Sequence, residues 1–243
     1  MIQPERIRIL NARPRRRGAY TLYWMQQAQR AEWNHALEFA AEEANRLRQP
    51  LVACFGLTDA FPEANLRHLA FMIEGLAGTA RALRRRGVAL VIELGSPETA
   101  AIRLAEQASL VVADRGYLRC QRQWRERLAR AAPCQVIQVE TDVVVPIEAV
   151  SGKEEYAAAT LRPRLRKVLD RFLVPLAETP LVKDSLGLRL GGEQADKLPA
   201  LLDTMRVDRS VAPSARFHGG ADEARRWLAR FIEEKLDAYA DQH

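Results

Sequence analysis

The residues of this sequence best placed to bind a ligand lie at the ends of apolar runs. They are Trp24, Met25, Phe55, Gly56, Asp114 and Arg115. Polar groups just past the end of a buried strand line a crevice rather than a core, so Asp114 and Arg115 are the better pointers to a binding site. Aromatic residues in such positions serve equally well as core residues, and for Trp24 and Phe55 the sequence leaves both interpretations open.

Catalysis has no recognisable signature in this chain. The sequence contains no GxGxxG, GxxxxGK(S/T), HExxH or GxSxG pattern. The four histidines, His35, His68, His218 and His243, stand apart from any cysteine or carboxylate cluster, so we predict no metal site and assign no catalytic residue. The three cysteines lack CxxC spacing, which argues against a disulfide framework and favours a reducing, cytoplasmic environment.

Arginine is concentrated in three segments, residues 13–17, 114–130 and 162–171. The whole chain carries 37 basic and 31 acidic residues, a net charge of +6 that indicates only a mild preference for polyanions. Clustered basic residues are the electrostatic footprint of a phosphate-backbone partner. The alternative is a set of solvated helix faces together with a mobile N-terminal arm, and charge alone does not exclude it.

Short apolar runs alternate with longer amphipathic stretches, and these elements must position the candidate residues. The predicted strands are residues 19–25, 51–57, 88–94, 110–113 and 136–139; the predicted helices are residues 34–48, 65–86, 97–108 and 119–131. The apolar runs are continuous rather than alternating, which is typical of parallel strands covered on both faces. We therefore predict an α/β fold with a doubly wound, five-stranded parallel sheet. With the strand order 3-2-1-4-5, a crevice forms between the ends of the first and fourth strands.

The chain divides into four segments on this pattern. We predict a basic N-terminal arm over residues 1–18, an α/β domain over 19–145, a connector over 146–216 and a C-terminal helical segment over 217–243. A helix over residues 222–239 has an amphipathic stripe that needs a partner. No run approaches the ~18 apolar residues of a membrane span, and charges interrupt the N-terminus where a signal peptide is apolar, so we expect no membrane segment.

Several motifs carry a family resemblance. They are residues 23–26, 29–30, 34–37, 67–72, 122–124, 151–157, 160–163 and 217–220. Their order resembles the amino-terminal antenna domain of class II DNA photolyases, followed by the first helix of that family's flavin-binding domain; the Ser-Gly-Lys-Glu-Glu-Tyr-Ala run of residues 151–157 is the most distinctive. The sequence departs from the family at Trp33, where an acidic residue is usual, and it ends at His243, where the family continues into a helical FAD domain.

The resemblance implies light-driven repair of cyclobutane pyrimidine dimers in UV-damaged DNA, with photoexcited reduced FAD as electron donor. It implies that the crevice residues hold an antenna chromophore of the 8-hydroxy-deazaflavin type, and that Tyr239 matches the first flavin-contacting tyrosine. Phosphate contacts position such an enzyme without reading sequence, and the predicted contacts are Arg162, Arg164, Arg166 and Lys167. Nearly all FAD-binding residues lie outside this sequence, so we expect the chain alone neither to retain FAD nor to repair dimers, and the missing helical domain is an expected partner.

Two other functions remain open from the residues themselves. One is a stand-alone nucleotide- or flavin-binding α/β module, and the other is an accessory domain that binds DNA without catalysis. The turn after the first predicted strand reads Gln26-Gln27-Ala28-Gln29 rather than a glycine-rich phosphate loop, which weighs against the nucleotide module. The oligomeric state cannot be predicted from the sequence.

Overall fold

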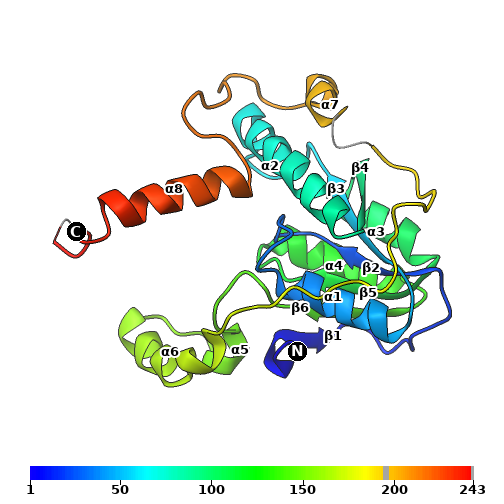
Figure 1. Cartoon of the computed structure of the whole chain (residues 1–243), viewed down its shortest axis with the longest axis horizontal. Coiled ribbons are helices and arrows are strands. Elements are labelled where there is room, and N and C mark those ends of the chain that lie inside the picture. Colours follow the sequence, from blue (N-terminus) through cyan, green and yellow to red (C-terminus); the bar gives the residue numbers. More distant parts are fainter. Residues whose placement is uncertain (194–196, 242–243) are drawn as a thin grey trace.

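The chain, described here as a computed structural model over residues 1–193 and 197–241, is built on a six-stranded sheet with helices on both faces (Figure 1). The strands are β1 (Ile7–Ile9), β2 (Tyr20–Trp24), β3 (Leu51–Leu57), β4 (Ala89–Leu94), β5 (Ala108–Asp114) and β6 (Gln135–Val139). Their order is β1-β6-β5-β2-β3-β4, and β2 to β6 are parallel. This confirms the α/β class and the predicted order of the five parallel strands.

The prediction of five strands is one too few. The additional strand, β1, lies in the segment predicted to be a basic arm and pairs antiparallel with the edge strand β6, with Arg8 opposite Gln138. β1 is only three residues long and lies at the edge of the sheet, beside β6. Its sequence, Ile-Arg-Ile, lacks the continuous apolar run that identified the other strands.

The helices of the described residues are η1 (Pro4–Arg6), α1 (His35–Arg46), α2 (Leu66–Arg85), α3 (Pro97–Ala105), α4 (Arg119–Ala131), α5 (Ile147–Val150), α6 (Ala158–Phe172), α7 (Leu198–Thr204) and α8 (Ala221–Glu234). The four helices predicted between the strands, α1 to α4, begin and end close to their predicted bounds. Asn34 caps α1 by accepting the N–H of Leu37 at 3.0 Å, and Asn65 caps α2. Gly87 follows α2 with φ +75°, a left-handed conformation that favours glycine at a helix end.

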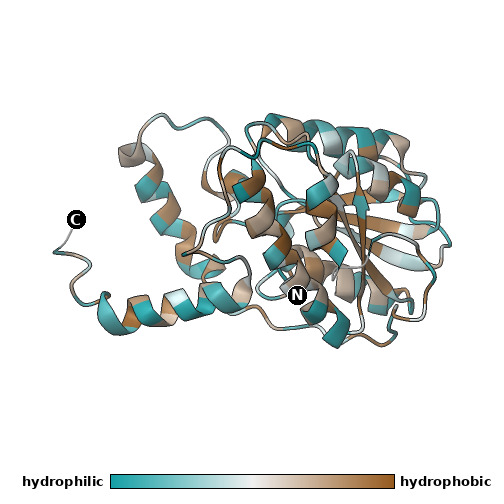
Figure 2. Cartoon of the chain, turned by 90° about the horizontal axis from the view of Figure 1, so that it is seen from above, coloured by the Kyte–Doolittle hydropathy of each residue, from teal (hydrophilic) through white to brown (hydrophobic). Residues whose placement is uncertain are grey.

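Two separate apolar cores form, one on each face of the sheet. Residues of α1 and α2 pack on one face with Tyr23 and Met25, and residues of α3 and α4 pack on the other with Leu22 and Trp24. Successive side chains of β2 thus alternate between the two cores. Apolar residues accordingly lie on the inner sides of the helices and polar residues on the outer sides (Figure 2).

The C-terminal third is attached to this domain at a few points. The connector is held by Ser185, whose Oγ donates to the Leu51 carbonyl at 2.6 Å, and by Thr179, whose N–H donates to Glu38 at 2.6 Å. Helices α6 and α8 both project from the sheet domain (Figure 1). Gly219 leads into α8 directly against α2, because a Cβ there would lie 1.9 Å from the Phe71 carbonyl oxygen. Among the described residues, no helix has the length and apolar character needed to cross a membrane.

Candidate functional site

A cavity of about 240 Å³ lies at the carboxyl ends of β2 and β3, at the predicted edge of the sheet. Three of the residues predicted for the crevice line it, namely Met25, Phe55 and Gly56. Ligands of open α/β sheets bind outside the carboxyl ends of the strands, where the strand order reverses. In this sheet the reversal occurs at β2, which lies between β5 and β3. No residue of β5 lines the cavity, so it lies on the β3 side of β2 rather than between β2 and β5 as predicted.

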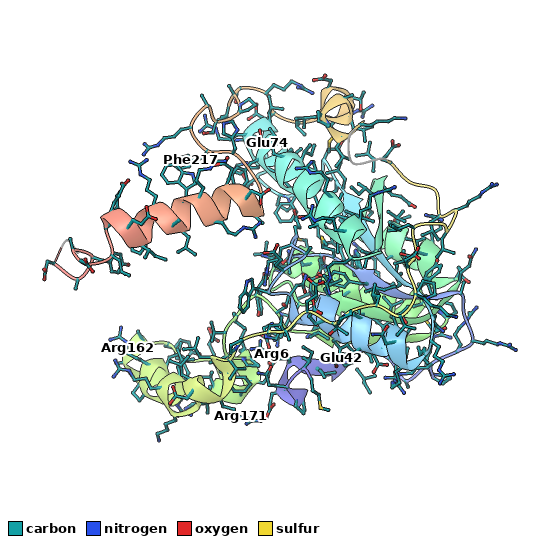
Figure 3. All side chains as sticks on the ribbon, in the orientation of Figure 1. Arg6, Glu42, Glu74, Arg162, Arg171 and Phe217 are labelled. Carbon is teal, nitrogen blue, oxygen red and sulfur yellow. The ribbon has the colours of Figure 1, made fainter. Side chains whose placement is uncertain are left out.

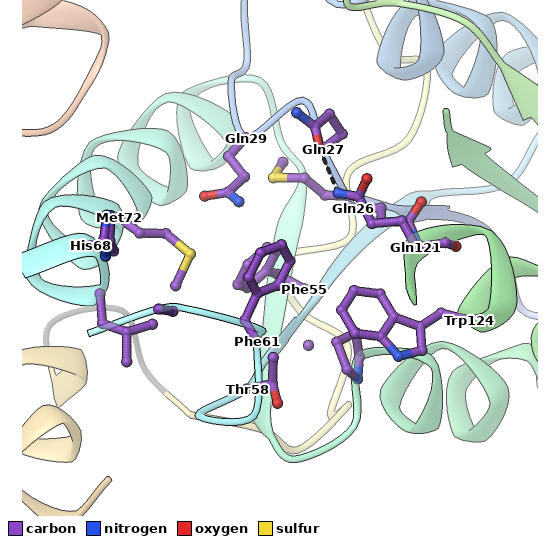
Figure 4. A pocket seen from close by; sticks show the side chains of 15 residues that line it. Gln26, Gln27, Gln29, Phe55, Thr58, Phe61, His68, Met72, Gln121 and Trp124 are labelled. Carbon is purple, nitrogen blue, oxygen red and sulfur yellow. Dashed lines mark hydrogen bonds between the residues drawn. The ribbon is translucent and has the colours of Figure 1, made fainter. Parts of the chain in front are cut away.

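The apolar wall of the cavity comes from three elements (Figure 4). Phe55 extends from β3, Met72 from α2 and Trp124 from α4, and Phe61 follows β3 in the loop before α2. The rings of Phe61 and Trp124 lie with their centroids 6.1 Å apart and tilted by 56°. Gly56 keeps the start of α3 close to β3, because a Cβ would meet the Pro97 Cα at 2.3 Å. The cavity therefore has flat aromatic faces on a rigid support.

Most of the polar residues that line the cavity are glutamines, namely Gln26, Gln27, Gln29 and Gln121; Thr58 and His68 are the others. Gln121 donates from Nε2 to the Gln27 side chain at 2.5 Å, and Gln26 donates to the Gln121 carbonyl at 2.9 Å. No aspartate, glutamate, lysine or arginine is among the described residues that line the cavity; His68, whose Nδ1 accepts the Asn65 N–H, is its one titratable group. Neutral amides both donate and accept, so the site suits an uncharged polar ring.

Asp114 does not line this cavity, contrary to the prediction. Its side chain is fully buried and accepts the backbone N–H groups of Gln26, Gln27 and Ala28 at 2.5, 2.6 and 2.6 Å. Burial raises the pKa of Asp114, and the three N–H donors oppose that rise. The carboxylate does not contact the cavity but holds the backbone of the loop that carries Gln26 and Gln27.

Trp24 and Arg115 also lie outside the cavity lining. Trp24 is fully buried in the core under α3 and α4, because it follows Tyr23 on the opposite face of β2. Arg115 is turned toward Glu140 and Glu148, with ion pairs of 3.1 and 2.5 Å that raise its pKa. The sequence prediction is therefore wrong for Trp24, Asp114 and Arg115 as lining residues.

Phe61, Trp124 and the glutamines were missed as lining residues. Trp124 had a signal, since it belongs to the 122–124 motif of the family resemblance, but within the predicted helix 119–131 a tryptophan serves equally well as a core residue. Phe61 stands in an irregular loop, where no periodicity marks the direction of a side chain. Gln26 and Gln29 belong to the 23–26 and 29–30 motifs of the family resemblance, but the sequence pattern gives the 26–29 turn no role beyond that of a poor phosphate loop.

The four residues predicted to contact DNA are all exposed on α6, with Arg162 at its outer end (Figure 3). They do not share one face of the helix. Arg162 and Arg166 are one turn apart, whereas Arg164 lies roughly 200° around the axis from Arg162. Arg164 also pairs with Glu155 at 3.3 Å. Lys167 lies between the two faces.

Tyr239 follows the end of α8, which is shorter than the predicted 222–239 helix. Its side chain is half exposed, and its ring packs edge-on against Phe231 with centroids 5.5 Å apart. One tyrosine on an exposed segment does not form a flavin site. The segment around Tyr239 therefore does not by itself fit FAD.

The family model for DNA photolyase matches residues 21–181. The chain belongs to the DNA photolyase family. It is 45% identical over 240 residues to a deoxyribodipyrimidine photo-lyase of Methanothermobacter thermautotrophicus, a match that covers 98% of this chain and 53% of that protein. A deoxyribodipyrimidine photo-lyase of Potorous tridactylus is 29% identical over 219 residues, covering 88% of this chain and 41% of that protein. This photolyase-family chain spans about half the length of the curated relatives it matches.

Solved photolyases share the fold. An archaeal photolyase from Sulfolobus tokodaii, described as containing two FAD molecules, superposes with a TM-score of 0.62 at 16% identity, over 86% of this chain and 46% of that one. A class III photolyase from Agrobacterium tumefaciens superposes with a TM-score of 0.65 at 19% identity, over 89% of this chain and 45% of that one. These matches show that most of this chain shares its fold with about half of each solved photolyase chain.

Proposed function

We propose that this chain is the light-harvesting part of a class II deoxyribodipyrimidine photo-lyase. In this proposal the cavity at the ends of β2 and β3 holds an antenna chromophore of the 8-hydroxy-deazaflavin type, bound by Met25, Phe55, Gly56 and the newly identified lining residues. The excitation passes to FAD in a helical domain that begins at α8. The FAD then repairs pyrimidine dimers in UV-damaged DNA, chemistry that side chains alone do not supply.

The character of the cavity carries this proposal. Its walls combine the aromatic faces of Phe55, Phe61 and Trp124 with neutral amides and hold no charged side chain among the described residues. A fused, planar ring with carbonyl and N–H edges matches both features. The cavity of about 240 Å³ lies below the ~300–1,000 Å³ of typical ligand sites, which favours a ring system alone with its tail in solvent.

The test is a titration of the purified chain with 8-hydroxy-deazaflavin, followed through the visible absorption band of the chromophore. We expect a shifted band with wild type. Ala64→Trp, which fills the cavity from its rim, should abolish the shift; Ala60→Trp, on the same loop but outside the lining, should leave it unchanged. No shift at tens of micromolar with folded wild-type protein would contradict the proposal.

The partner half is the second element of the proposal. Helix α8 exposes Trp227, Leu228 and Ile232, by 36, 56 and 52%, and leaves this apolar face for another domain to cover. Mixing the chain with the separately produced helical half of the Methanothermobacter relative should give a complex that retains FAD and repairs dimers under blue light. The chain alone should do neither. Stoichiometric FAD on the isolated chain would contradict the proposal that the helical half holds FAD.

A further inference from the structure

A second hollow, of about 410 Å³, lies between β1 and α4, apart from the chromophore cavity. Arginines dominate its lining: Arg8 from β1, and Arg122, Arg125 and Arg130 from α4. Glu126 is the single acidic residue that lines it, and it pairs with Arg130 at 3.5 Å. The hollow is therefore strongly positive.

Arg125 is the unusual member of this group, because its side chain is only 5% exposed. Its Nη1 donates to the side-chain oxygen of Gln26 at 2.6 Å, which is a neutral partner. Among the described residues no carboxylate lies within ion-pair distance of it. A guanidinium has five N–H donors, so most of the donors of Arg125 remain unused where it lines the hollow.

A buried charge without a counter-ion is costly for the folded protein. Burial lowers the pKa of Arg125 to about 10, so the group is still charged at neutral pH. Asp114 is the main compensating charge, but its oxygens already accept three backbone N–H groups. The structure thus keeps a recessed cation whose cost an incoming anion would offset.

Two neighbouring arginines add to the positive charge that Arg125 gives the hollow. Arg8 and Arg122 have no ion pair with any residue in the described ranges. Arg8 contributes to lowering the pKa of Glu148, but that carboxylate is bound by Arg115 at 2.5 Å. The wall itself is fixed by Asn11, which donates to the carbonyls of Ala129 and Cys134 at 3.0 and 3.1 Å.

We propose that this hollow binds a small phosphate-bearing anion of the mono- or diphosphate class, with the phosphate on Arg125 and flanked by Arg8 and Arg122. Arginine forks match phosphate oxygens with two parallel hydrogen bonds. A protruding terminal phosphate reaches a recessed guanidinium, whereas the broad backbone of a duplex reaches only exposed residues such as Arg122 and Arg130. The site does not depend on the chromophore proposal.

Calorimetric titration of the full chain with inorganic pyrophosphate tests the site. Arg125→Met should weaken binding about ten-fold or more, the effect of losing charged hydrogen bonds. Arg122→Gln, on the exposed rim, should weaken it less. Arg119→Gln is the matched control, because Arg119 is an exposed arginine of the same helix outside the hollow, and binding should be unchanged.

Thermal melting separates lost binding from lost folding. Without pyrophosphate, Arg125→Met should melt at or above the temperature of wild type, because it removes an uncompensated buried charge. Pyrophosphate should raise the melting temperature of wild type but not of this variant. If Arg125→Met does not fold, the comparison of Arg122→Gln with Arg119→Gln decides the question.

Two sources of the phosphate are distinguishable. Gln26 contacts Arg125 and also lines the chromophore cavity, so the phosphate belongs either to the tail of a ligand in that cavity or to a free metabolite. Pyrophosphate binding that persists in Ala64→Trp establishes the site whatever the cavity holds. An Arg125→Met variant that loses affinity for flavin mononucleotide but not for riboflavin indicates the tail.

Three results would overturn the proposal. The first is no pyrophosphate binding by folded wild type at millimolar concentration. The second is an equal loss for Arg119→Gln and Arg125→Met, which would show diffuse surface charge rather than a site. The third is binding of duplex DNA that depends on Arg125 without any binding of pyrophosphate.

Discussion

Helices α2 and α8 are both amphipathic, but only one of them has its apolar face covered. Leu69, Ile73, Leu76 and Leu83 of α2 are at most 3% exposed against the sheet, whereas α8 buries no side chain. The comparison shows that an apolar stripe predicts that a face must be covered and does not identify the cover. For α2 the cover is the sheet domain itself, and for α8 we assign it to the proposed helical half.

The largest expected effect concerns the polar support of the sheet domain. Asp114→Ala leaves three backbone N–H groups buried without their acceptor, so we expect the free energy of unfolding to fall by about 3–5 kcal/mol. Denaturant unfolding followed by circular dichroism measures it. Asp222→Ala, which removes an exposed ion pair on α8, should cause no measurable loss. An equal loss of unfolding free energy in both variants would contradict the difference between the buried sheet domain and the exposed α8.

A pair of leucines tests the same contrast through packing. Leu110 is fully buried in β5, and Leu110→Ala should lower the free energy of unfolding by about 2–5 kcal/mol. Leu228 on α8 is 56% exposed, so Leu228→Ala should change stability by less than about 0.5 kcal/mol. The midpoint of urea unfolding at two protein concentrations is the measurement. A large, concentration-dependent effect at Leu228 would mean that a second copy of the chain covers α8.

Acid should weaken the sheet domain partly through His35, which lies at the start of α1. Burial, with Arg6 and Arg30 nearby, lowers the pKa of His35 to about 4, while an unfolded histidine titrates near 6.5. Between these values the unfolded chain binds a proton that the folded chain does not, so stability falls as the pH drops from about 6.5 to 4. We expect His35→Gln to remove about 1–2 kcal/mol of this loss in unfolding measured at pH 7 and pH 5. An unchanged pH dependence would contradict the role of burial.

The smallest effect concerns DNA and the other projecting helix, α6. We expect weak binding of duplex DNA, near 10⁻⁴–10⁻⁶ M, with a log–log salt slope of roughly −2 to −3 and no preference for damaged DNA. Arg162→Ala with Arg166→Ala removes two contacts from one face and should flatten the slope by nearly 2. Arg164→Ala, on the opposite face and paired with Glu155, should change it less. An unchanged slope for the double variant would assign binding to residues 13–17 or to the hollow beside α4.

The sheet was predictable because its five parallel strands are mostly apolar runs that alternate with amphipathic helices, two of which begin at a capping asparagine. The lining of the site was only partly predictable. Trp24 and Met25 are adjacent and apolar, and both sides of β2 are buried. The sequence therefore does not indicate which of these two side chains lines the cavity. Asp114 has the position expected of a lining residue, but its partners are backbone N–H groups, which a sequence does not mark.

The positions of the arginines also could not be predicted from the sequence alone. A run of basic residues within ten positions looks like one surface, but the helical repeat distributes Arg162 and Arg164 to opposite faces. The recessed Arg125 was counted in a basic segment and had no distinguishing neighbour in the sequence. Its character comes from burial beside β1, the strand that the sequence pattern did not reveal.

The carboxylate of Asp114 has an optical consequence under the proposed function. Transfer of excitation between two pigments depends on the angle between their transition dipoles as well as on their separation. Three short hydrogen bonds that Asp114 accepts from the backbone N–H groups of Gln26, Gln27 and Ala28 hold their loop, which forms one wall of the cavity. A pigment seated there would keep a constant orientation toward its acceptor, so a residue that never touches the pigment would set how well the two couple.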